Sequence, residues 1–361
     1  MRITGISSVL LATPLKRPIR TAIHRFDRMY HVVVRLDTDS GLFGNGLLFA
    51  QSKAQGQLFQ AALAVFEEKI IGEDPLMVEK VWQKLWKAMN FIGNSGVAIF
   101  AQSAIDTALW DIVGKAAGLP LCKLLGQHVE SLPVYASDGL WLSYSPDELR
   151  AEALAFVEEG FKAIKIRIGS SRLEDDLARV AAVRETVGPE IKLIADANQA
   201  WDSLTAIKFG QAAAPYDLFW LEEPVPYYDL AASAAVAARL DIALATGESE
   251  YTYLGFTRLA QEKAADIWMP DLQRVGGISG LMKVIRLAEA CNLPVTPHLF
   301  PEISLHAAVC APTCNIIEYV SWWEPLFEEK PRLVNGVLSP GEKPGLGLAI
   351  PERVINAYRV G

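Results

Sequence analysis

Three acidic residues occur at equal intervals along the chain, each at the polar end of a short apolar run. Asp196, Glu222 and Glu248 are 26 residues apart, about the length of one strand-loop-helix-loop unit. If each acid ends one of three successive parallel strands, the carboxylates converge at one end of the sheet. Three negative charges at one point need a cation, and oxygen ligands suit a hard divalent ion such as Mg²⁺. The spacing therefore predicts a magnesium site.

Two cations share one face of an apolar segment at residues 163–169. Lys165 and Arg167 alternate with isoleucines, so strand periodicity places the isoleucines on one face and both cations on the other. The isoleucines belong against a helical layer, and the cations then point to the interior, where their burial is costly unless anions face them. The acids on the following strands, with a substrate carboxylate, would be those anions. A salt-bridge network without catalysis is the alternative.

An acid and a histidine end the next two expected strands. Asp271 follows a Met-Pro pair and His298 follows Pro297, and neighbouring strands would place the two side chains side by side. A carboxylate beside an imidazole sets its tautomer and stabilises its charged form, so His298 is a candidate general base. Glu318 ends the eighth segment and could donate a hydrogen bond if protonated. The other histidines, interpreted as structural, are His24, His31, His128 and His306. His24 is the least certain of them because it lies in a polar loop.

Short apolar segments alternate with amphipathic segments from about residue 131 onward. The expected strands are 132–137, 162–169, 191–198, 217–224, 242–249, 265–271, 293–299 and 316–321. Segments such as 173–187 and 277–290 have helical periodicity. Eight strands that alternate with helices indicate a parallel barrel rather than an open doubly wound sheet. No GxGxxG motif follows a strand and opens a helix, which argues against a dinucleotide-binding fold.

The flanking regions have a different pattern. Residues 1–50 have the pattern of strands and turns, and helical periodicity follows over 54–125. We therefore predict an α/β protein with a modified barrel and an α+β capping domain. The expected units are a capping domain at 1–127, a catalytic barrel at 128–330, and a C-terminal segment at 331–361 that rejoins the capping domain.

The composition is that of a globular protein with a large core. Hydrophobic residues make up 51% of the 361 residues, and the formal net charge of −8 argues against a nucleic-acid surface. There is no run of roughly 18 apolar residues and no signal-peptide pattern at the amino terminus. The four cysteines form no CxxC pair, and we interpret them as buried free thiols. We expect a cytoplasmic protein without a membrane or nucleic-acid partner.

The chain resembles the enolase superfamily, specifically its mandelate racemase subgroup, over nearly its whole length. Residues 104–126, with Ala-Leu-Trp-Asp at 108–111, are similar to the family's amino-terminal signature, and residues 165–201 are similar to its central signature. The resemblance implies a (β/α)₇β barrel capped by an α+β domain built from both termini. A Lys or His base beside Mg²⁺ is known in this superfamily. The implied roles are Asp196, Glu222 and Glu248 as Mg²⁺ ligands, His298 with Asp271 as a dyad, and Glu318 as an electrophilic acid.

Two positions depart from the pattern of the subgroup. Relatives commonly carry Lys-x-Lys on the second barrel strand, with the second lysine as a base, whereas this chain has Arg167 there. Arginine stays protonated and is a better hydrogen-bond donor than base. Leu47 occupies a position where relatives often carry an acid. Muconate cycloisomerase-like relatives place a lysine on the sixth strand, where this chain has Asp271, so the mandelate racemase side is favoured.

The resemblance implies removal of a proton next to a carboxylate. Mg²⁺ would act as a Lewis acid that stabilises the enediolate, with Lys165 and Glu318 assisting and His298 as the base. A racemase needs a base on both faces of the carbon, and Arg167 leaves a conventional base on only one. We therefore expect an acid-sugar dehydratase that converts an aldonate or aldarate to a 2-keto-3-deoxy acid. A sugar-lactone cycloisomerase is the closest alternative, followed by a racemase or epimerase and then a non-catalytic binding protein.

Substrate selection is expected at the mouth of the barrel. The polar segment 14–28 is a candidate lid, from which His24 and Arg25, together with Asn198 of the barrel, are predicted to bind the substrate. The expected partner is a small-molecule carboxylate, and the protein is expected to be a homo-oligomer. Three tryptophans near strand ends either shape the pocket or only pack: Trp141, Trp322 and Trp323.

Overall fold

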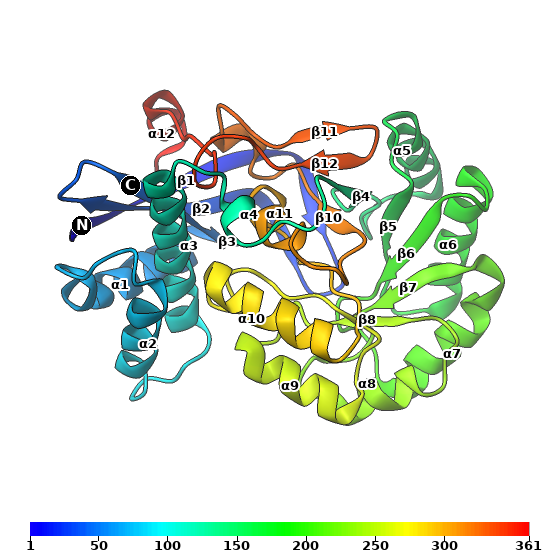
Figure 1. Ribbon diagram of the computed structural model, residues 1–361. Helices are drawn as coiled ribbons and strands as arrows, with labels where there is room; N and C mark the ends of the chain where they lie inside the picture. Colours follow the sequence, from blue (N-terminus) through cyan, green and yellow to red (C-terminus); the bar gives the residue numbers. More distant parts are fainter. Residues whose placement is uncertain (361) are drawn as a thin grey trace.

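A parallel barrel and a smaller α+β unit make up the protein (Figure 1). The computed structural model describes residues 1–360. The barrel strands are β4 (Leu132–Ala136), β5 (Ala163–Arg167), β6 (Lys192–Asp196), β7 (Leu218–Glu222), β8 (Leu244–Thr246), β9 (Ile267–Trp268) and β10 (Ile317–Tyr319). Strands β4 to β9 pair in parallel in chain order, and β10 returns to pair with β4. The barrel predicted from the alternating pattern is confirmed.

Helices cover the outside of this barrel. They are α5 (Pro146–Glu158), α6 (Leu173–Val187), α7 (Ser203–Ala213), α8 (Leu230–Ala237), α9 (Thr252–Glu262), α10 (Gly277–Ala290) and α11 (Pro301–Ala308). The sequence at the start of α5 shows how such a helix is set: Ser145 and Glu148 form a reciprocal capping box. In the described chain, β10 is followed directly by the short 3-10 helix η2 (Glu324–Leu326) and not by an eighth helix that covers the barrel, so the order is (β/α)₇β.

The seventh barrel strand differs from the sequence prediction. Residues 293–299 do not form a regular strand and meet their neighbour only at isolated parallel bridges. Pro294 and Pro297 lack the backbone N–H that a ladder requires, so they interrupt the pairing. One of the remaining bridges joins Asp271 to His298, and the two predicted dyad residues are neighbours despite the broken strand.

The amino-terminal unit, here called the cap, is an antiparallel sheet backed by helices. Its elements are β1 (Ile3–Arg20), β2 (Arg25–Thr38), β3 (Phe43–Ala50), α1 (Lys53–Ile70), α2 (Val78–Ala88), α3 (Val97–Ala117) and α4 (Leu121–Leu124). Gly44 and Gly46 let β3 approach α3 closely, because a Cβ at either position would lie 2.0 Å from a backbone oxygen of α3. Leu47, in the position where relatives often carry an acid, is buried in the core.

Helix α3 is a core helix. It is long and apolar enough to cross a membrane by length and composition, but 78% of its apolar window is buried inside the protein. Its Asp111 carboxylate accepts hydrogen bonds from the backbone N–H groups of Asn45 and Leu346, both at 2.9 Å, and pairs with Lys115 at 2.7 Å. One side chain of α3 therefore joins the sheet of the cap to the C-terminal segment.

The C-terminal segment contacts both units. Strands β11 (Arg332–Val334) and β12 (Val337–Ser339) form a hairpin, and β12 pairs antiparallel with β4 of the barrel. Helix α12 (Glu352–Tyr358) then leads to the sheet of the cap, where Arg359 bridges Leu11 of β1. The two chain ends consequently lie at the same end of the molecule (Figure 1).

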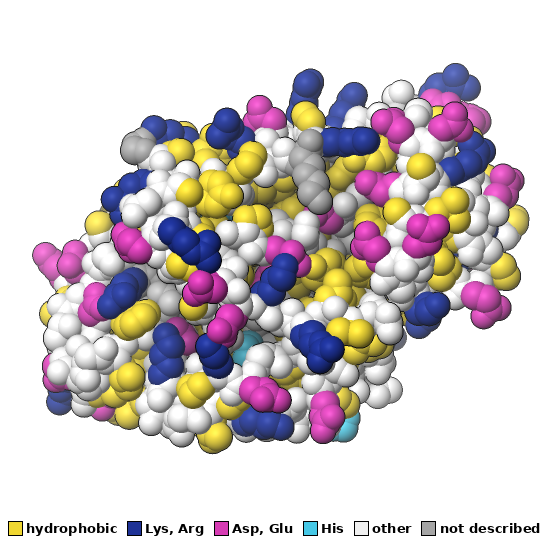
Figure 2. Space-filling model, turned by 90° about the horizontal axis from the view of Figure 1, so that it is seen from above, with side chains coloured by type: hydrophobic (Ala, Val, Ile, Leu, Met, Phe, Trp, Pro, Cys, Tyr) yellow, Lys and Arg dark blue, Asp and Glu magenta, His cyan; other side chains and the backbone are white. Residues whose placement is uncertain are grey.

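Charged side chains of both signs are interspersed on the face of the molecule shown in Figure 2.

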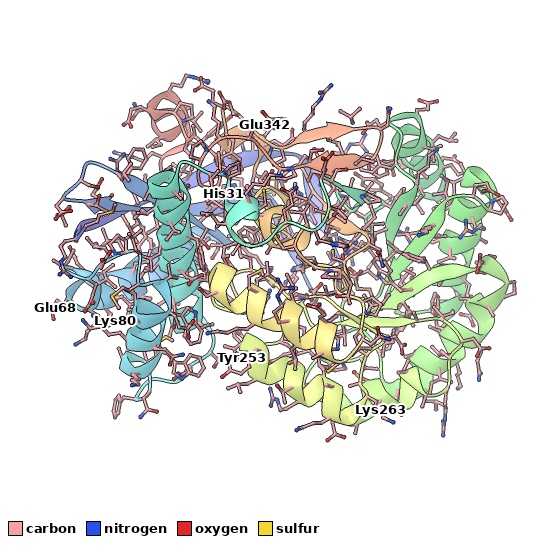
Figure 3. The ribbon with its side chains drawn as sticks, viewed as in Figure 1. His31, Glu68, Lys80, Tyr253, Lys263 and Glu342 are labelled. Carbon is pink, nitrogen blue, oxygen red and sulfur yellow. The ribbon has the colours of Figure 1, made fainter. Side chains whose placement is uncertain are left out.

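Two histidines are buried. His31 of β2 lies inside the protein (Figure 3), where its Nε2 contacts Thr13 Oγ1 at 2.9 Å. His306 of α11 is equally buried, with Nε2 3.1 Å from the carbonyl oxygen of Leu346. Burial lowers the pKa of His31 to about 3 and that of His306 to about 4. Both rings are therefore neutral in the fold.

The two buried histidines predict a loss of stability in mild acid. Their folded pKa values lie below the unfolded value of about 6.5, so the stabilisation is complete above that pH and declines as the pH falls below it. Each should account for about 2 kcal/mol of lost unfolding free energy between pH 7 and pH 5. Urea denaturation should show a smaller loss for His31→Phe than for the wild type, while exposed His128→Gln behaves like the wild type. Equal pH dependence in all three proteins would contradict this prediction.

Candidate active site

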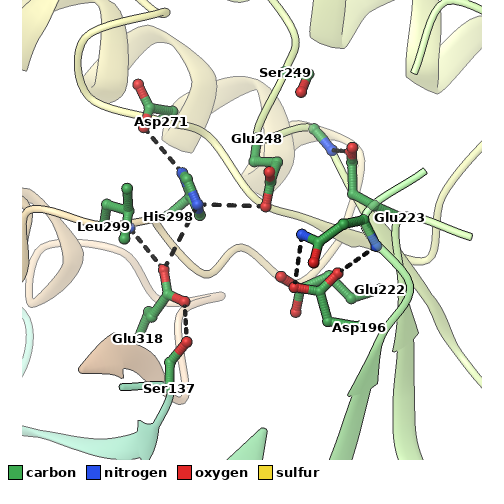
Figure 4. A network of polar contacts seen from close by, with 12 residues as sticks. Ser137, Asp196, Glu222, Glu223, Glu248, Ser249, Asp271, His298, Leu299 and Glu318 are labelled. Atoms are coloured by element: carbon green, nitrogen blue, oxygen red, sulfur yellow. Dashed lines mark hydrogen bonds and ion pairs between the residues drawn. The ribbon is translucent and has the colours of Figure 1, made fainter. Parts of the chain in front are cut away.

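The strand-end residues lie together at the carboxyl end of the barrel (Figure 4). Strand register accounts for part of this arrangement, because Arg167 is opposite Asp196 and Asp196 is opposite Glu222. Glu248 and Asp271 come shortly after the ends of β8 and β9. Consecutive parallel strands thus bring side chains that are distant in sequence to one site.

Lys165 is the centre of a buried ion-pair network. Its Nζ lies 2.6 Å from Glu222 Oε1, 2.8 Å from Glu318 Oε1 and 3.6 Å from Asp196 Oδ2, and none of these side chains is more than 1% exposed. Burial alone would lower the pKa of Lys165, but Glu222 and Glu318 outweigh it and raise the pKa above its ordinary value. Lys165 is therefore a fixed positive charge rather than a base.

Arg167 is held beside this network. Its Nη2 donates to Ser137 Oγ at 3.1 Å, and its Nη1 lies 3.4 Å from Asp196 Oδ2. The guanidinium packs on Trp141, with Cζ 4.9 Å from the ring centroid. Its buried Nε and Nη1 have no hydrogen-bond partner. Burial would lower the pKa of Arg167, but Asp196 and Glu222 raise it, so the side chain is a cation with donors to spare.

His298 and Asp271 form the dyad expected from the sequence. Nδ1 of His298 contacts Asp271 Oδ2 at 2.9 Å, and Nε2 lies 3.3 Å from Glu248 Oε2 and 4.0 Å from Glu318 Oε2. Burial alone would lower the pKa of His298, but Glu248, Glu318 and Asp271 together raise it to about 9. A base must be neutral. Compensation of the negative charge of Glu248 would therefore make His298 a better base near neutral pH.

Glu318 is an acceptor in this structure. Its Oε1 accepts from Ser137 Oγ at 2.6 Å, and its Oε2 accepts from the backbone N–H of Leu299 at 2.8 Å. Burial would raise the pKa of Glu318, but Lys165 and His298 outweigh it and lower the pKa below its ordinary value. The sequence interpretation allowed a protonated donor here; the two facing cations instead keep the group ionised.

The acids expected to bind a metal have the charge that suits a divalent cation, but their side chains are not arranged around a common centre. Among residues 1–360, no three His, Cys, Asp or Glu side chains form a ready metal-binding group; Glu222 contacts Lys165, and Glu248 contacts His298. Burial raises the pKa of Glu222 against the opposing effect of Lys165, and Asp196 raises it further. The five carboxylates of the site outnumber its three fixed cations, and oxygen donors with surplus negative charge suit Mg²⁺. The carboxylates are Asp196, Glu222, Glu248, Asp271 and Glu318, and the cations are Lys165, Arg167 and Arg274.

Asn198 supports the first of these acids. Its backbone N–H donates to Asp196 Oδ1 at 2.8 Å, and its side-chain Nδ2 donates to Asp196 Oδ2 at 3.2 Å. The residue has a φ of +44°, a conformation that costs energy for a residue other than glycine. Its buried Oδ1 has no partner. Asn198 therefore orients Asp196 and keeps one acceptor for a ligand.

Only part of the expected lid lies at the site. The segment expected to be a lid is the far end of the β1–β2 hairpin. It is joined to the barrel by a hydrogen bond of 3.1 Å from the N–H of Leu142 to the carbonyl oxygen of Arg20. His24 is close enough to Glu248 for that carboxylate to raise its pKa, although partial burial lowers the pKa overall. Arg25 is exposed at the hairpin end, where its backbone is opposite that of Arg20 in the strand register. The hairpin thus brings His24 within electrostatic range of Glu248, and Arg25 stays at the exposed end of the hairpin.

The three tryptophans have different roles. Trp141 covers Arg167 and stacks on Trp322, with centroids 6.4 Å apart and planes at 24°. Trp322 also donates from Nε1 to Asp138 Oδ1 at 2.8 Å. Trp323 is fully buried in the core. Trp141 and Trp322 therefore shape the wall next to Arg167, and Trp323 packs.

The sequence interpretation missed four side chains that contact the site. Ser137 and Glu223 directly follow strand ends or site residues, a signal that could have found them. Trp220 and Arg274 carry no such signal, because one lies inside a strand and the other in a loop. The contacts are Ser137 with Glu318, Trp220 with Glu222 at 3.0 Å, Glu223 with the N–H of Gly247 at 3.2 Å, and Arg274 with Asp271 at 3.5 Å.

Known proteins resemble this chain along its whole length. It is 36% identical to L-talarate/galactarate dehydratase of Salmonella typhimurium, over 89% of this chain and 81% of that enzyme. It is 34% identical to D-galactarolactone cycloisomerase of Agrobacterium fabrum, over 100% of this chain and 99% of that enzyme. The crystal structure of L-talarate dehydratase from Polaromonas sp. JS666, complexed with Mg and L-glucarate, matches with a TM-score of 0.93 and 35% identity, covering 100% of this chain and 98% of that one.

Two family descriptions divide the chain between them. Residues 4–126 match the mandelate racemase / muconate lactonizing enzyme N-terminal domain, and residues 148–354 match the enolase C-terminal domain-like family. Both matches agree with the cap and the barrel of the structure. The chain therefore belongs to the mandelate racemase / muconate lactonizing enzyme family of the enolase superfamily.

Proposed function

We propose that the protein removes the proton next to the carboxylate of an acid sugar, an aldonate or aldarate, and eliminates water to give a 2-keto-3-deoxy acid. The observation that carries the proposal is the position of His298 opposite fixed cations. Its Nε2 lies 4.0 Å from one oxygen of Glu318, whose other oxygen lies 2.8 Å from Lys165. A proton acceptor and a cation for a carboxylate are thus within reach of one small molecule. The similarity to L-talarate/galactarate dehydratase supports this class of substrate.

Asp196, Glu222 and Glu248 are the residues that would hold Mg²⁺. When bound, the ion supplies Lewis-acid stabilisation of negative charge that develops on the substrate carboxylate. Lys165 adds a permanent positive charge from its place beside Glu222. The relative complexed with Mg and L-glucarate supports both the metal and the kind of ligand.

His298 serves as base and then as acid in the proposed reaction. Nε2 takes the proton from the α-carbon while Asp271, 2.9 Å from Nδ1, stabilises the imidazolium. The imidazolium then gives this proton to the hydroxyl that leaves the β-carbon, which departs as water. This sequence requires the proton and the hydroxyl to lie on the same face. Arg167 cannot replace the base on the opposite face, because a guanidinium stays protonated.

Opening of an acid-sugar lactone is a second candidate, and Arg167 favours it. In that reaction the oxygen that leaves the β-carbon is a ring carboxyl oxygen, which departs as a stable anion and needs no proton. Nε and Nη1 of Arg167 make no hydrogen bond, although Nη1 lies 3.4 Å from Asp196, and they could receive this carboxylate but could not protonate a hydroxyl. The similarity to D-galactarolactone cycloisomerase along the whole chain supports this candidate.

We also propose that the protein is cytoplasmic and forms homo-oligomers. The four cysteines are free and three of them are buried, which supports a reducing compartment. The oligomer is proposed from the family alone, and light scattering coupled to gel filtration would measure its size.

Loss of one proposed ligand should weaken metal binding without unfolding the protein. We expect Asp196→Asn to bind Mg²⁺ about tenfold or more weakly than the wild type in titration calorimetry, because one of three carboxylates is removed. Glu302→Gln is the matched control. This carboxyl is equally buried but belongs to α11, and burial raises its pKa to about 8, so little charge is lost. Unchanged affinity in Asp196→Asn would remove this residue from the ligand set.

Dehydration predicts a defined isotope pattern. In D₂O with Mg²⁺, the 2-keto-3-deoxy product should carry deuterium at C3, because the enol formed by elimination takes up solvent hydrogen there. Proton NMR of reactions with galactarate, L-talarate, arabinonate and galactarolactone would show it. His298→Asn should be slower by about 10²- to 10⁴-fold. Recovery of an epimerised acid without loss of water would reject the proposal, and turnover of the lactone alone would select the second candidate.

A lysine in place of Arg167 should give the second face a base. We expect Arg167→Lys to exchange the α-proton of both epimers of a substrate with D₂O, whereas the wild type exchanges only one. Arg167→Met, which has neither a base nor a cation, separates the new base from simple loss of the guanidinium. Exchange of both epimers by the wild type would show that Arg167 does not limit the chemistry to one face.

A further inference from the structure

The segment that follows the dyad aspartate is attached to the cap at several points. We call residues 271–279 the coupling segment. In Figure 1 the helix that continues from it, α10, lies beside α3. The bonds of the segment to the cap are Gln273 with Phe49 of β3, Gly276 with Trp82 of α2 at 3.0 Å, and Ser279 with Asp106 of α3 at 2.6 Å. A short stretch of the barrel is thus tied to three elements of the cap.

Gln273 makes the most complete of these attachments. Its side chain is 4% exposed; Oε1 accepts the N–H of Phe49 at 3.0 Å, and Nε2 donates to the C=O of the same residue at 3.4 Å. Strand β3 is at the edge of the sheet, so these backbone groups have no further strand to pair with. One amide from the barrel therefore takes the place of a neighbouring strand.

The backbone of Gln273 holds the dyad carboxylate. Asp271 Oδ1 accepts the N–H groups of Gln273 and Arg274, both at 3.0 Å, which leaves Oδ2 for His298 Nδ1. The direction of the carboxylate is thus set by the backbone of the coupling segment. Because Asp271 orients the imidazole, the direction of His298 depends on the same backbone.

Two further contacts limit the freedom of the segment. Arg274, 3.5 Å from Asp271 Oδ2, also lies over Phe100 of α3, with Cζ 5.8 Å from the ring centroid. Gly277 has a φ of +87°, and a Cβ there would lie 2.4 Å from Asp106 Oδ2. The segment is packed so closely against the cap that a shift of one is expected to move the other.

We propose that Gln273 is a positioning residue that couples the docking of the cap to the orientation of the Asp271–His298 dyad. Its side chain holds Phe49 of the cap, and its backbone N–H holds Asp271. It acts through these two bonds and has no contact with the reacting nitrogen of His298. The role in catalysis rests on the proposed function, in which His298 is the base, whereas the coupling is a property of the protein without substrate.

Gln273→Met tests the proposal with the full-length protein. Methionine has a similar length but no amide, so both bonds to Phe49 are lost while the backbone N–H to Asp271 is kept. Gln60→Met is the matched control, because the Gln60 amide also bonds to a cap strand, donating to the backbone oxygen of Ser8 at 3.4 Å and to its Oγ at 3.2 Å. Both variants should melt at a lower temperature than the wild type, because each loses side-chain hydrogen bonds.

The decisive measurement needs no substrate. We expect the ring ¹⁵N and Nδ1–H signals of His298, identified by their absence in His298→Asn, to shift or broaden in Gln273→Met and to stay unchanged in Gln60→Met. On an acid sugar that the wild type converts, kcat of Gln273→Met should fall by about 10- to 100-fold with little change in KM.

Two results would overturn the proposal. One is an unchanged His298 signal in Gln273→Met, which would make Gln273 a structural residue only. The other is an equal change of the signal, or an equal loss of kcat, in the control. If no acid sugar reacts with the wild type but the His298 signal changes only in Gln273→Met, the coupling stands and the proposed function fails.

Discussion

The balance of buried charge at the carboxyl end of the barrel is the constraint on which the rest of the site depends. Lys165 is buried, and its Nζ contacts Glu222 and Glu318 at 2.6 and 2.8 Å. Removing one member of such a group leaves an uncompensated charge in a medium of low polarity, which costs about 3–5 kcal/mol. Each charge is therefore tolerated only because the others are present. The same balance explains why His298 is attracted to carboxylates and why the surplus of negative charge suits a divalent cation.

Strand register in the barrel brings the charged side chains together, and contacts with the cap hold the segment that carries Asp271. Register places Arg167, Asp196 and Glu222 in one row, so no loop has to be ordered to bring them together. The dyad is different, because its seventh strand is interrupted by prolines and only isolated bridges remain. Its geometry therefore relies on the backbone bonds to Asp271 and on the attachment of the following segment to the cap. Rigid strands position the charges, and a segment attached to the cap positions the Asp271 carboxylate that orients His298.

The sequence predicted the parts of the site that follow from local periodicity. Asp196, Glu222 and Glu248 were found because the strand-helix unit repeats, and Lys165 because strand side chains alternate. The broken strand at 293–299 was missed because its apolar pattern outweighed the missing N–H groups of two prolines. Gln273 was missed because its partner Phe49 is distant in sequence, and Ser137 was missed although it directly follows a strand end. The ionised state of Glu318 could not be predicted either, since it depends on how closely two cations approach it.

The side of the site that carries His298 differs chemically from the side that carries Arg167, and the residues around Arg167 contribute to the difference. Trp141 presents a flat ring to the guanidinium at 4.9 Å, and Ser137 accepts from Nη2. A planar, delocalised cation gains from such stacking, whereas a compact ammonium group does not gain to the same extent. Trp322, stacked on Trp141 and bonded to Asp138, keeps that ring in place. The neighbours are thus arranged for an arginine, which indicates that a cation without basicity on this face is a built feature of the site. Chemistry that needs one base and one fixed charge is favoured over chemistry that needs two bases.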